Sequence, residues 1–205
     1  MALMVLDRAL EATVMSLRGK DSHERLRDEV WDGVTFIMPE ADNLHDQIAS
    51  FFHGVFFAVF GMDPNYVLQF RINLSDRERG WGKNYRVPDM TLFSAHGPAR
   101  DCGNHWFGGP LIALEVVSPG DRSRDKLDFY AKVGTREVLI VDRDPWLIEM
   151  YELRRGRMRL KGTTSPTNRA ILDSSVVPLQ FQLIRSRPRP KFRIIHTQSG
   201  QEWVR

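Results

Sequence analysis

The sequence predicts a mixed α/β fold in which helices flank a central mixed β-sheet. Three patterns support this prediction: apolar residues recur at three- and four-residue intervals in 42–60, run almost unbroken through 111–117, and return as a strand pattern at 136–142. A helical pattern separates the last two, so we expect a parallel pair of strands joined by a right-handed helical crossover. The chain has 205 residues, enough to bury one sizeable core.

Two helices are expected in the N-terminal part of the chain. The first covers 3–17, where apolar side chains recur at roughly helical spacing. The second covers 42–60, with Asp42 or Asn43 as its N-cap, because short oxygen-bearing side chains accept hydrogen bonds from the first backbone N–H groups. Gly61 is its expected end, and its broad apolar stripe should face the core.

Strands are expected after the second helix. The patterns at 66–74 and 85–93 are separated by the polar, glycine-containing loop 75–84, which indicates a hairpin connection. The run at 111–117 has almost no polar alternation and predicts a central strand buried on both faces. Further strands are expected at 136–142, in a hairpin over 146–162 and in a tail hairpin over 192–204.

Composition limits the setting and the partners of the protein. Cys102 is the only cysteine, which excludes an intrachain disulfide or a cysteine-based zinc site and suits a reducing cytoplasm. No segment approaches the ~20 apolar residues of a membrane-spanning helix. The net charge is +3, and residues 185–205 alone carry six basic residues against Glu202. The basic character therefore belongs to a C-terminal segment on a near-neutral body.

We expect a single domain overall, made of three parts. An N-terminal helix and lead-in cover 1–40, the core covers 40–183, and a basic extension with a hairpin covers 184–205. The basic residues at 185–193 alternate with proline, serine and phenylalanine, which indicates an extended segment. This segment either lies along a nucleic-acid backbone or is a solvated linker to the last hairpin.

Two carboxylates stand out in the strand patterns. Asp89 follows Pro88 at the head of a strand, and Glu115 lies within an apolar strand. An ionised carboxylate buried without compensation costs several kcal/mol, so Glu115 needs a partner, either a basic side chain or a metal ion. If the two strands are neighbours, both acids can converge on one hard cation such as Mg²⁺.

A lysine follows in the next helical segment. The helix is expected at 123–133, with Asp121 or Ser123 as its cap and Gly134 as its C-terminal glycine. Lys126 then falls in the first turn, close to the end of the Glu115 strand. From there its ammonium group could orient a water molecule or stabilise negative charge on a phosphate. Four residues on, Tyr130 lies on the same helix face.

These residues carry a resemblance to a known family. The segments VPDMTLF and LEVVSPGDRSRDKLDFYAKVGTREVLIVD resemble the Uma-two-type family of putative bacterial restriction endonucleases, a branch of the PD-(D/E)XK nuclease superfamily. The resemblance covers roughly 40–155. The positions that match the family pattern in order are Pro88–Asp89, Glu115–Pro119, Lys126, Tyr130, Gly134, Glu137 and Asp142.

The resemblance implies a restriction-endonuclease-like fold and magnesium-dependent cleavage of DNA phosphodiester bonds, with Mn²⁺ as a substitute cation. Asp89 and Glu115 would be the metal ligands, and Lys126 would complete the catalytic set. The sequence departs from the superfamily pattern at Val117, where the usual lysine is expected. Either the lysine has migrated to the helix, or the site has decayed. His45 matches a histidine often found near that helix start in the family.

Several alternatives stay open at the level of sequence. Arg122 and Arg124 either contact phosphates or are exposed charges beside the predicted site, and Tyr130 is a supporting residue. The protein as a whole is expected to be a cytoplasmic, homodimeric DNA endonuclease. The alternative is a catalytically inactive DNA-binding or homo-oligomeric interaction protein on the same fold.

Overall fold

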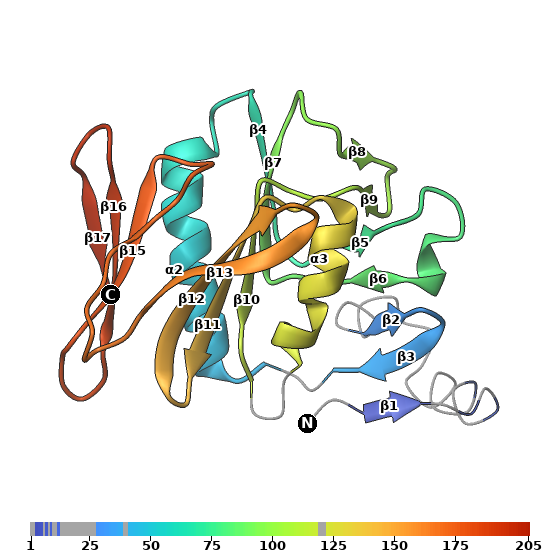
Figure 1. The fold of residues 1–205 in the computed structure, drawn as a ribbon, viewed down its shortest axis with the longest axis horizontal. Helices are drawn as coiled ribbons and strands as arrows, with labels where there is room; N and C mark the ends of the chain where they lie inside the picture. The colour runs from blue at the N-terminus through green and yellow to red at the C-terminus, as the bar shows by residue number, and fades with distance from the viewer. Residues whose placement is uncertain are drawn as a thin grey trace.

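A computed structural model describes most of the chain, and the statements below concern the described residues: 3–5, 7, 9, 12, 28–38, 41–118 and 122–205. The strands form three sheets, arranged around one long helix and one short helix (Figure 1). Among the described residues, no helix has the length and apolar character needed to cross a membrane.

A six-stranded mixed sheet forms the centre, in the order β13-β12-β11-β10-β7-β4. Its β10 and β11 are parallel, with Glu115 opposite Ile140, and the other pairs are antiparallel. The predicted parallel pair is therefore confirmed. The strands are β4 (Tyr66–Gln69), β7 (Met90–Ser94), β10 (Ile112–Val116), β11 (Glu137–Arg143), β12 (Trp146–Arg154) and β13 (Arg157–Thr164).

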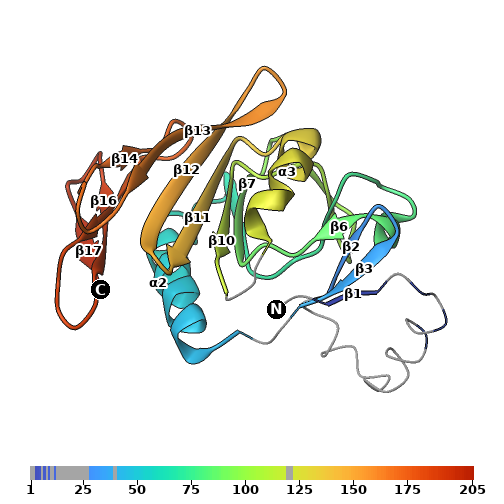
Figure 2. The same cartoon turned by 60° about the horizontal axis from the view of Figure 1, so that its bottom comes forward.

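Helices cover the two faces of this central sheet (Figure 2). The long helix α2 (Asn43–Phe60) packs on the face that carries Leu114 and Val116. The short 3₁₀ turn η2 (Ser123–Lys126) continues into α3 (Leu127–Val133), which packs on the opposite face. Because strand side chains alternate between faces, Glu115 belongs to the α3 face.

The helix boundaries test the predicted caps. Asp42 caps α2 and accepts a hydrogen bond from the backbone N–H of His45, and Gly61 follows its last turn. Gly134 ends α3 with a positive φ of 85°, as a C-terminal glycine can. Ser123, in contrast, is the first residue of η2, and the N-cap position is Arg122, whose side chain makes no capping hydrogen bond. The other proposed cap, Asp121, lies outside the described residues.

A second sheet lies beside α3 and has the order β1-β3-β2-β6-β5-β9-β8. It is antiparallel except for the β5·β9 pair. The 3₁₀ turn η1 (Trp81–Lys83) lies in the loop between β5 and β6. The strands are β1 (Leu3–Val5), β2 (Glu29–Trp31), β3 (Val34–Ile37), β5 (Leu74–Ser75), β6 (Tyr85–Arg86), β8 (Arg100–Asp101) and β9 (Trp106–Phe107).

Two expected strands are each divided between sheets. The stretch 66–74 contributes β4 to the central sheet and β5 to the second sheet, because the chain turns at Arg71, whose φ is 52°. The stretch 85–93 is divided between β6 and β7 around Pro88, which has no backbone N–H for a ladder.

The prediction of a helix over 3–17 is wrong for its first residues. Leu3–Val5 is a strand that pairs with β3, so the helix does not begin at residue 3. Ala9 and Ala12 are helical, and most other residues of that range lie outside the described part. The apolar spacing alone could not show that Leu3–Val5 would form a strand instead of the start of a helix, because their pairing partner β3 lies far along the chain.

A third, four-stranded sheet closes the chain, in the order β14-β15-β16-β17. It lies on the other side of α2 from the central sheet, and Phe52 and Phe56 of α2 both stack on Phe181 (Figure 1). The tail hairpin expected from the sequence is present as β16 and β17. The strands are β14 (Leu172–Asp173), β15 (Leu179–Ile184), β16 (Lys191–His196) and β17 (Glu202–Val204).

Candidate catalytic and metal site

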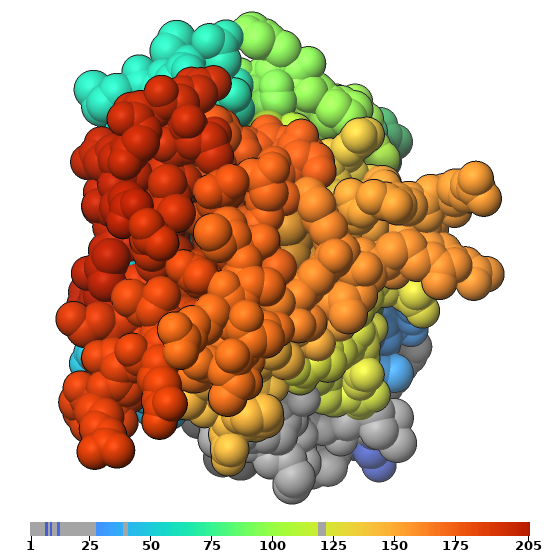
Figure 3. Space-filling model, turned by 60° about the vertical axis from the view of Figure 1, so that its left-hand side comes forward, coloured from blue at the N-terminus to red at the C-terminus, as the bar shows by residue number. Residues whose placement is uncertain are grey.

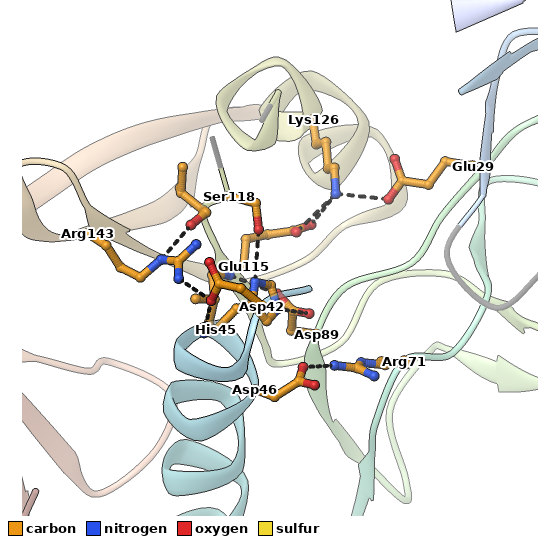
Figure 4. A network of polar contacts seen from close by, with 12 residues as sticks. Glu29, Asp42, His45, Asp46, Arg71, Asp89, Glu115, Ser118, Lys126 and Arg143 are labelled. Atoms are coloured by element: carbon orange, nitrogen blue, oxygen red, sulfur yellow. Dashed lines mark hydrogen bonds and ion pairs between the residues drawn. The ribbon is translucent and has the colours of Figure 1, made fainter. Parts of the chain in front are cut away.

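Asp89 lies just before β7, against the end of β10. Its backbone N–H donates to the carbonyl oxygen of Leu114 (3.0 Å), and its Oδ2 accepts from the N–H of Val116 (2.8 Å). Its Oδ1 lies 2.9 Å from Nε2 of His45 (Figure 4). Since Met90 is the register partner of Leu114, Asp89 and Glu115 occupy neighbouring strands at the same end of the sheet.

His45 connects the first turn of α2 to this strand end. It is buried, and its Nδ1 lies 3.2 Å from Oγ of Ser118. The cap that fixes this turn is itself held, because Nη1 of Arg143 donates to Asp42 at 2.6 Å. The hydrogen bond from Arg143 is the main cause that lowers the pKa of the Asp42 carboxyl. The histidine singled out by the resemblance therefore bonds directly to a predicted metal ligand.

Glu115 has the partner that its burial requires. Its side chain is 4% exposed, and Nζ of Lys126 lies 3.1 and 3.0 Å from its two carboxylate oxygens. The hydroxyl of Tyr130 donates a short hydrogen bond to Oε1. Complete burial, followed by the charge of Glu115, raises the pKa of Tyr130 well above its usual value, so this hydroxyl keeps its proton. Lys126 and Tyr130 both point at Glu115, as their spacing on one helix face suggested.

Glu29 is a member of this network that sequence reasoning missed. Its Oε1 lies 2.8 Å from Nζ of Lys126, and the side chains are 1% and 3% exposed (Figure 4). It also accepts from the N–H of Val87 (2.9 Å) and from Nε1 of Trp31 (2.7 Å). Lys126 therefore lies between two buried carboxylates. No sequence motif includes Glu29. The sequence hint that could have identified it is its position directly before the apolar residues Val30 and Trp31.

Arg86 adds a second buried cation close to Glu29. Its guanidinium lies 4.3 Å from the ring centre of Trp31 and 4.4 Å from that of Phe129. Burial is the main cause that lowers the pKa of Arg86, and the charge of Glu29 opposes this shift. The α3 face of the sheet end thus carries a charged network enclosed by aromatic side chains.

The two arginines predicted beside the site have different surroundings. Nε of Arg122 lies 2.6 Å from Oδ2 of Asp125, and its guanidinium lies over two aromatic rings, those of Trp31 and Phe36. Arg124 pairs with Asp142 (2.9 Å) and Glu149 (2.7 Å). Burial lowers the pKa of Arg124, but the hydrogen bonds from these two carboxylates outweigh it and the net shift is upward. Contact of either arginine with DNA stays a prediction.

The predicted metal ligands at this end of the sheet are two carboxylates, those of Asp89 and Glu115. In the described part of the chain, no group of three or more histidine, cysteine, aspartate or glutamate side chains could together hold a metal ion. Magnesium commonly takes only one or two carboxylates and fills its remaining positions with water or phosphate oxygens. Asp89 and Glu115 are therefore the residues that could hold such an ion, alongside their existing hydrogen-bond partners.

Comparisons with known proteins agree with the fold. The family model described as "Uma2: Putative restriction endonuclease" matches residues 15–184. No curated protein matches the chain. Among solved structures, a putative nuclease belonging to DUF820 from Anabaena variabilis ATCC 29413 is similar, with a TM-score of 0.53 and 18% identity over 65% of this chain and 75% of that chain. At this identity the likeness supports the fold alone. Because the family match spans most of its length, this chain belongs to the Uma2 family of putative restriction endonucleases.

Proposed function

We propose that the protein is a DNA endonuclease that hydrolyses phosphodiester bonds with Mg²⁺, for which Mn²⁺ can substitute. The observation that carries this proposal is the convergence of Asp89, Glu115 and Lys126 at one end of the central sheet. Membership of a family described as putative restriction endonucleases supports this substrate class. When bound, the cation would polarise a phosphate oxygen and increase the acidity of a water molecule.

Asp89 and Glu115 fit the cation because they supply hard oxygen ligands from adjacent strands. Each carboxylate is already oriented by the protein. His45 and the N–H of Val116 hold the two oxygens of Asp89, while Tyr130 directs its hydroxyl at Oε1 of Glu115. Oriented ligands lose little conformational freedom when an ion or a substrate arrives, so less of the binding free energy is lost to ordering.

Lys126 supplies positive charge at the place where a phosphate would meet the carboxylates. Its ammonium group is anchored by Glu29 as well as by Glu115, which favours a fixed position. A fixed cation stabilises the extra negative charge that develops on the phosphate in the transition state. Glu29 thereby acts as a positioning residue for Lys126.

The position of Lys126 also bears on the departure at Val117. Val117 continues the β10 ladder through its N–H to the carbonyl oxygen of Val141 and packs against the apolar cluster on the α3 face. Lys126 reaches Glu115 from η2 instead. This geometry favours migration of the lysine to the helical segment over decay of the site.

The test combines metal titration by calorimetry with plasmid nicking in Mg²⁺, on the wild type and on Glu115→Gln and Lys126→Met. We expect Glu115→Gln to abolish both metal binding and nicking. Lys126→Met should lower the nicking rate by about 10²–10³-fold, as removal of a transition-state donor does elsewhere. Glu137→Gln is the matched control, because Glu137 is a buried strand glutamate that pairs with Ile112 at the other end of β10.

The outcomes separate the proposal from its rivals. Metal binding without nicking of any DNA tested would favour the catalytically inactive DNA-binding protein, and no metal binding at all would refute the site. Circular dichroism of each variant excludes unfolding as the cause of a loss. The homodimer stays a prediction. Size-exclusion chromatography with light scattering tests it, because it measures the molecular mass of the protein in solution.

A further inference from the structure

Five exposed basic side chains gather at the connection between β15 and β16, at the start of β16 and at the end of the chain. None of them pairs with an acidic residue of the described chain, whereas the nearby Arg193 pairs with Glu202. We call this set the C-terminal basic edge; its members are Arg185, Arg187, Arg189, Lys191 and Arg205.

Backbone pairing brings these residues together. Ile184 and Lys191 are register partners in β15 and β16, so the residues between them form one short connection. The N–H of Phe192 donates to the carbonyl oxygen of Arg205 (2.8 Å), and the N–H of Arg205 donates back (3.0 Å). The C-terminus therefore lies beside the start of β16 (Figure 1). The C-terminal strands build much of the face shown in Figure 3.

The basic edge borders the end of α2 that carries the candidate site. Nη2 of Arg189 lies 3.4 Å from Oε1 of Gln47, and a groove lined by both residues and Arg205 also contacts Leu44 and Trp146. Trp146 is the register partner of Arg143, the residue that holds the Asp42 cap. Arg189 of the edge therefore contacts the first turns of α2, the same turns that carry His45.

The groove itself is too small for a nucleobase. Its volume of about 10 Å³ is roughly what one water molecule requires. Beneath it, Phe192 packs against Phe51 and Trp146, with ring centres 6.4 and 5.9 Å away. Recognition at this edge therefore depends on its exposed charge rather than on base stacking.

We propose that the C-terminal basic edge binds the phosphate backbone of duplex DNA on one side of the scissile phosphate, an inference that rests on the proposed function. Cations without internal acidic partners are available to replace the counterions that surround DNA. Because the edge lies next to the first turns of α2, DNA held there also passes the end of the sheet where Asp89 and Glu115 lie. The contacts would contribute affinity without sequence preference.

A second basic cluster provides the matched control. The tip of the β12–β13 hairpin carries Arg155, Arg157 and Arg159, which are exposed and pair with no acidic residue of the described chain. β12 runs from Trp146 beside the basic edge to Arg154 at this tip, a length of about 26 Å at the usual rise per residue. The edge carries five cations and the hairpin tip three, and the tip lies at the far end of β12, so removal of three charges from each cluster compares the two positions.

The experiment measures binding of the full-length protein to a labelled DNA duplex by fluorescence anisotropy, with EDTA present so that cleavage does not interfere. The DNA-binding constants of the wild type and of two triple variants are compared at salt concentrations between about 50 and about 200 mM. One replaces Arg185, Arg187 and Arg189 by glutamine, and the other replaces the three hairpin arginines by glutamine. We expect the first to lower the slope of log K against log salt by about 2.7 and weaken binding at least about tenfold.

We expect the hairpin variant to bind like the wild type. An unchanged slope in the first variant, or an equal loss in both, would overturn the proposal. The measurement needs neither metal nor cleavage, so failure of this inference can be distinguished from failure of the proposed function. A wild type that never nicks DNA but shows the expected change in slope would overturn the cleavage function and leave the DNA-binding edge standing.

Discussion

The contact between Glu29 and Lys126 gives the sharpest prediction about the buried network. Glu29→Gln keeps the shape of the side chain but removes its charge and one of its two acceptor oxygens. Three donors converge on that carboxylate: Nζ of Lys126, Nε1 of Trp31 and the N–H of Val87. At least one of them must therefore face an amide N–H₂ group, which accepts no hydrogen bond.

The expected loss in the free energy of unfolding depends on the contacts that Lys126 keeps after the substitution. Removing one member of a buried ion pair costs about 3–5 kcal/mol when the remaining charge is left uncompensated. Lys126 still has Glu115 at 3.0 Å, so we expect a smaller loss of about 2–3 kcal/mol in the free energy of unfolding. Combined with Lys126→Met, the substitution should show a coupling energy of about 1–3 kcal/mol, because the second change removes the charge that needed Glu29.

Urea unfolding of the wild type, both single variants and the double variant measures this coupling. The control cycle pairs Lys126→Met with Glu137→Gln. Glu137 is a buried glutamate that lies three residues, or about 10 Å, along the strands from the level of Glu115, the partner of Lys126. These two changes should be additive within about 0.5 kcal/mol. If the Glu29 cycle is equally additive, the ion pair does not couple the two residues, and the role of Glu29 in positioning Lys126 is refuted.

Three further predictions concern stability. Tyr130→Phe should cost about 1.5–3 kcal/mol in urea unfolding, because it removes a buried donor to the charged Glu115; a loss below about 0.5 kcal/mol would contradict the bond. Folding lowers the pKa of the Asp42 carboxyl from its ordinary value of 3.8, chiefly through the hydrogen bond from Arg143. The ionised carboxylate therefore adds to the free energy of unfolding above pH 3.8, and this addition is lost as the pH falls through the pKa of the folded protein. Asp42→Asn should therefore be less stable than the wild type near neutral pH, by about 0.5 kcal/mol for so exposed a group, and equally stable in strong acid. Phe52→Ala should cost about 3–5 kcal/mol, because this fully buried ring joins α2 to the third sheet.

Features that depend on local sequence could be predicted well. The Asp42 cap, the central strand Ile112–Val116 and the left-handed Gly134 each follow from a few neighbouring residues. The parallel pairing of β10 with β11 follows from the length and helical pattern of the segment between them. For the same reason Lys126 could be placed near Glu115, eleven residues earlier in the chain.

Features that depend on distant pairing could not be predicted. β1 pairs with β3 across more than thirty residues, and no local pattern distinguishes Leu3–Val5 from a helix start. The turn at Arg71 sends one apolar pattern into two sheets, which alternation alone does not reveal. Glu29 reaches Lys126 across almost a hundred residues, so the second anchor of the lysine appears only when β2 is placed beside β6.

The sequence presented Glu115 as either a salt-bridged residue or a metal ligand, and the charges of the network make these two roles compatible. Three carboxylates, those of Glu29, Asp89 and Glu115, share the strand end with two cations, Lys126 and Arg86. The formal charges of these five side chains alone sum to −1. The pairing with Lys126 thus stabilises the buried carboxylate in the folded protein, and the excess negative charge is compatible with the divalent cation of the proposed function.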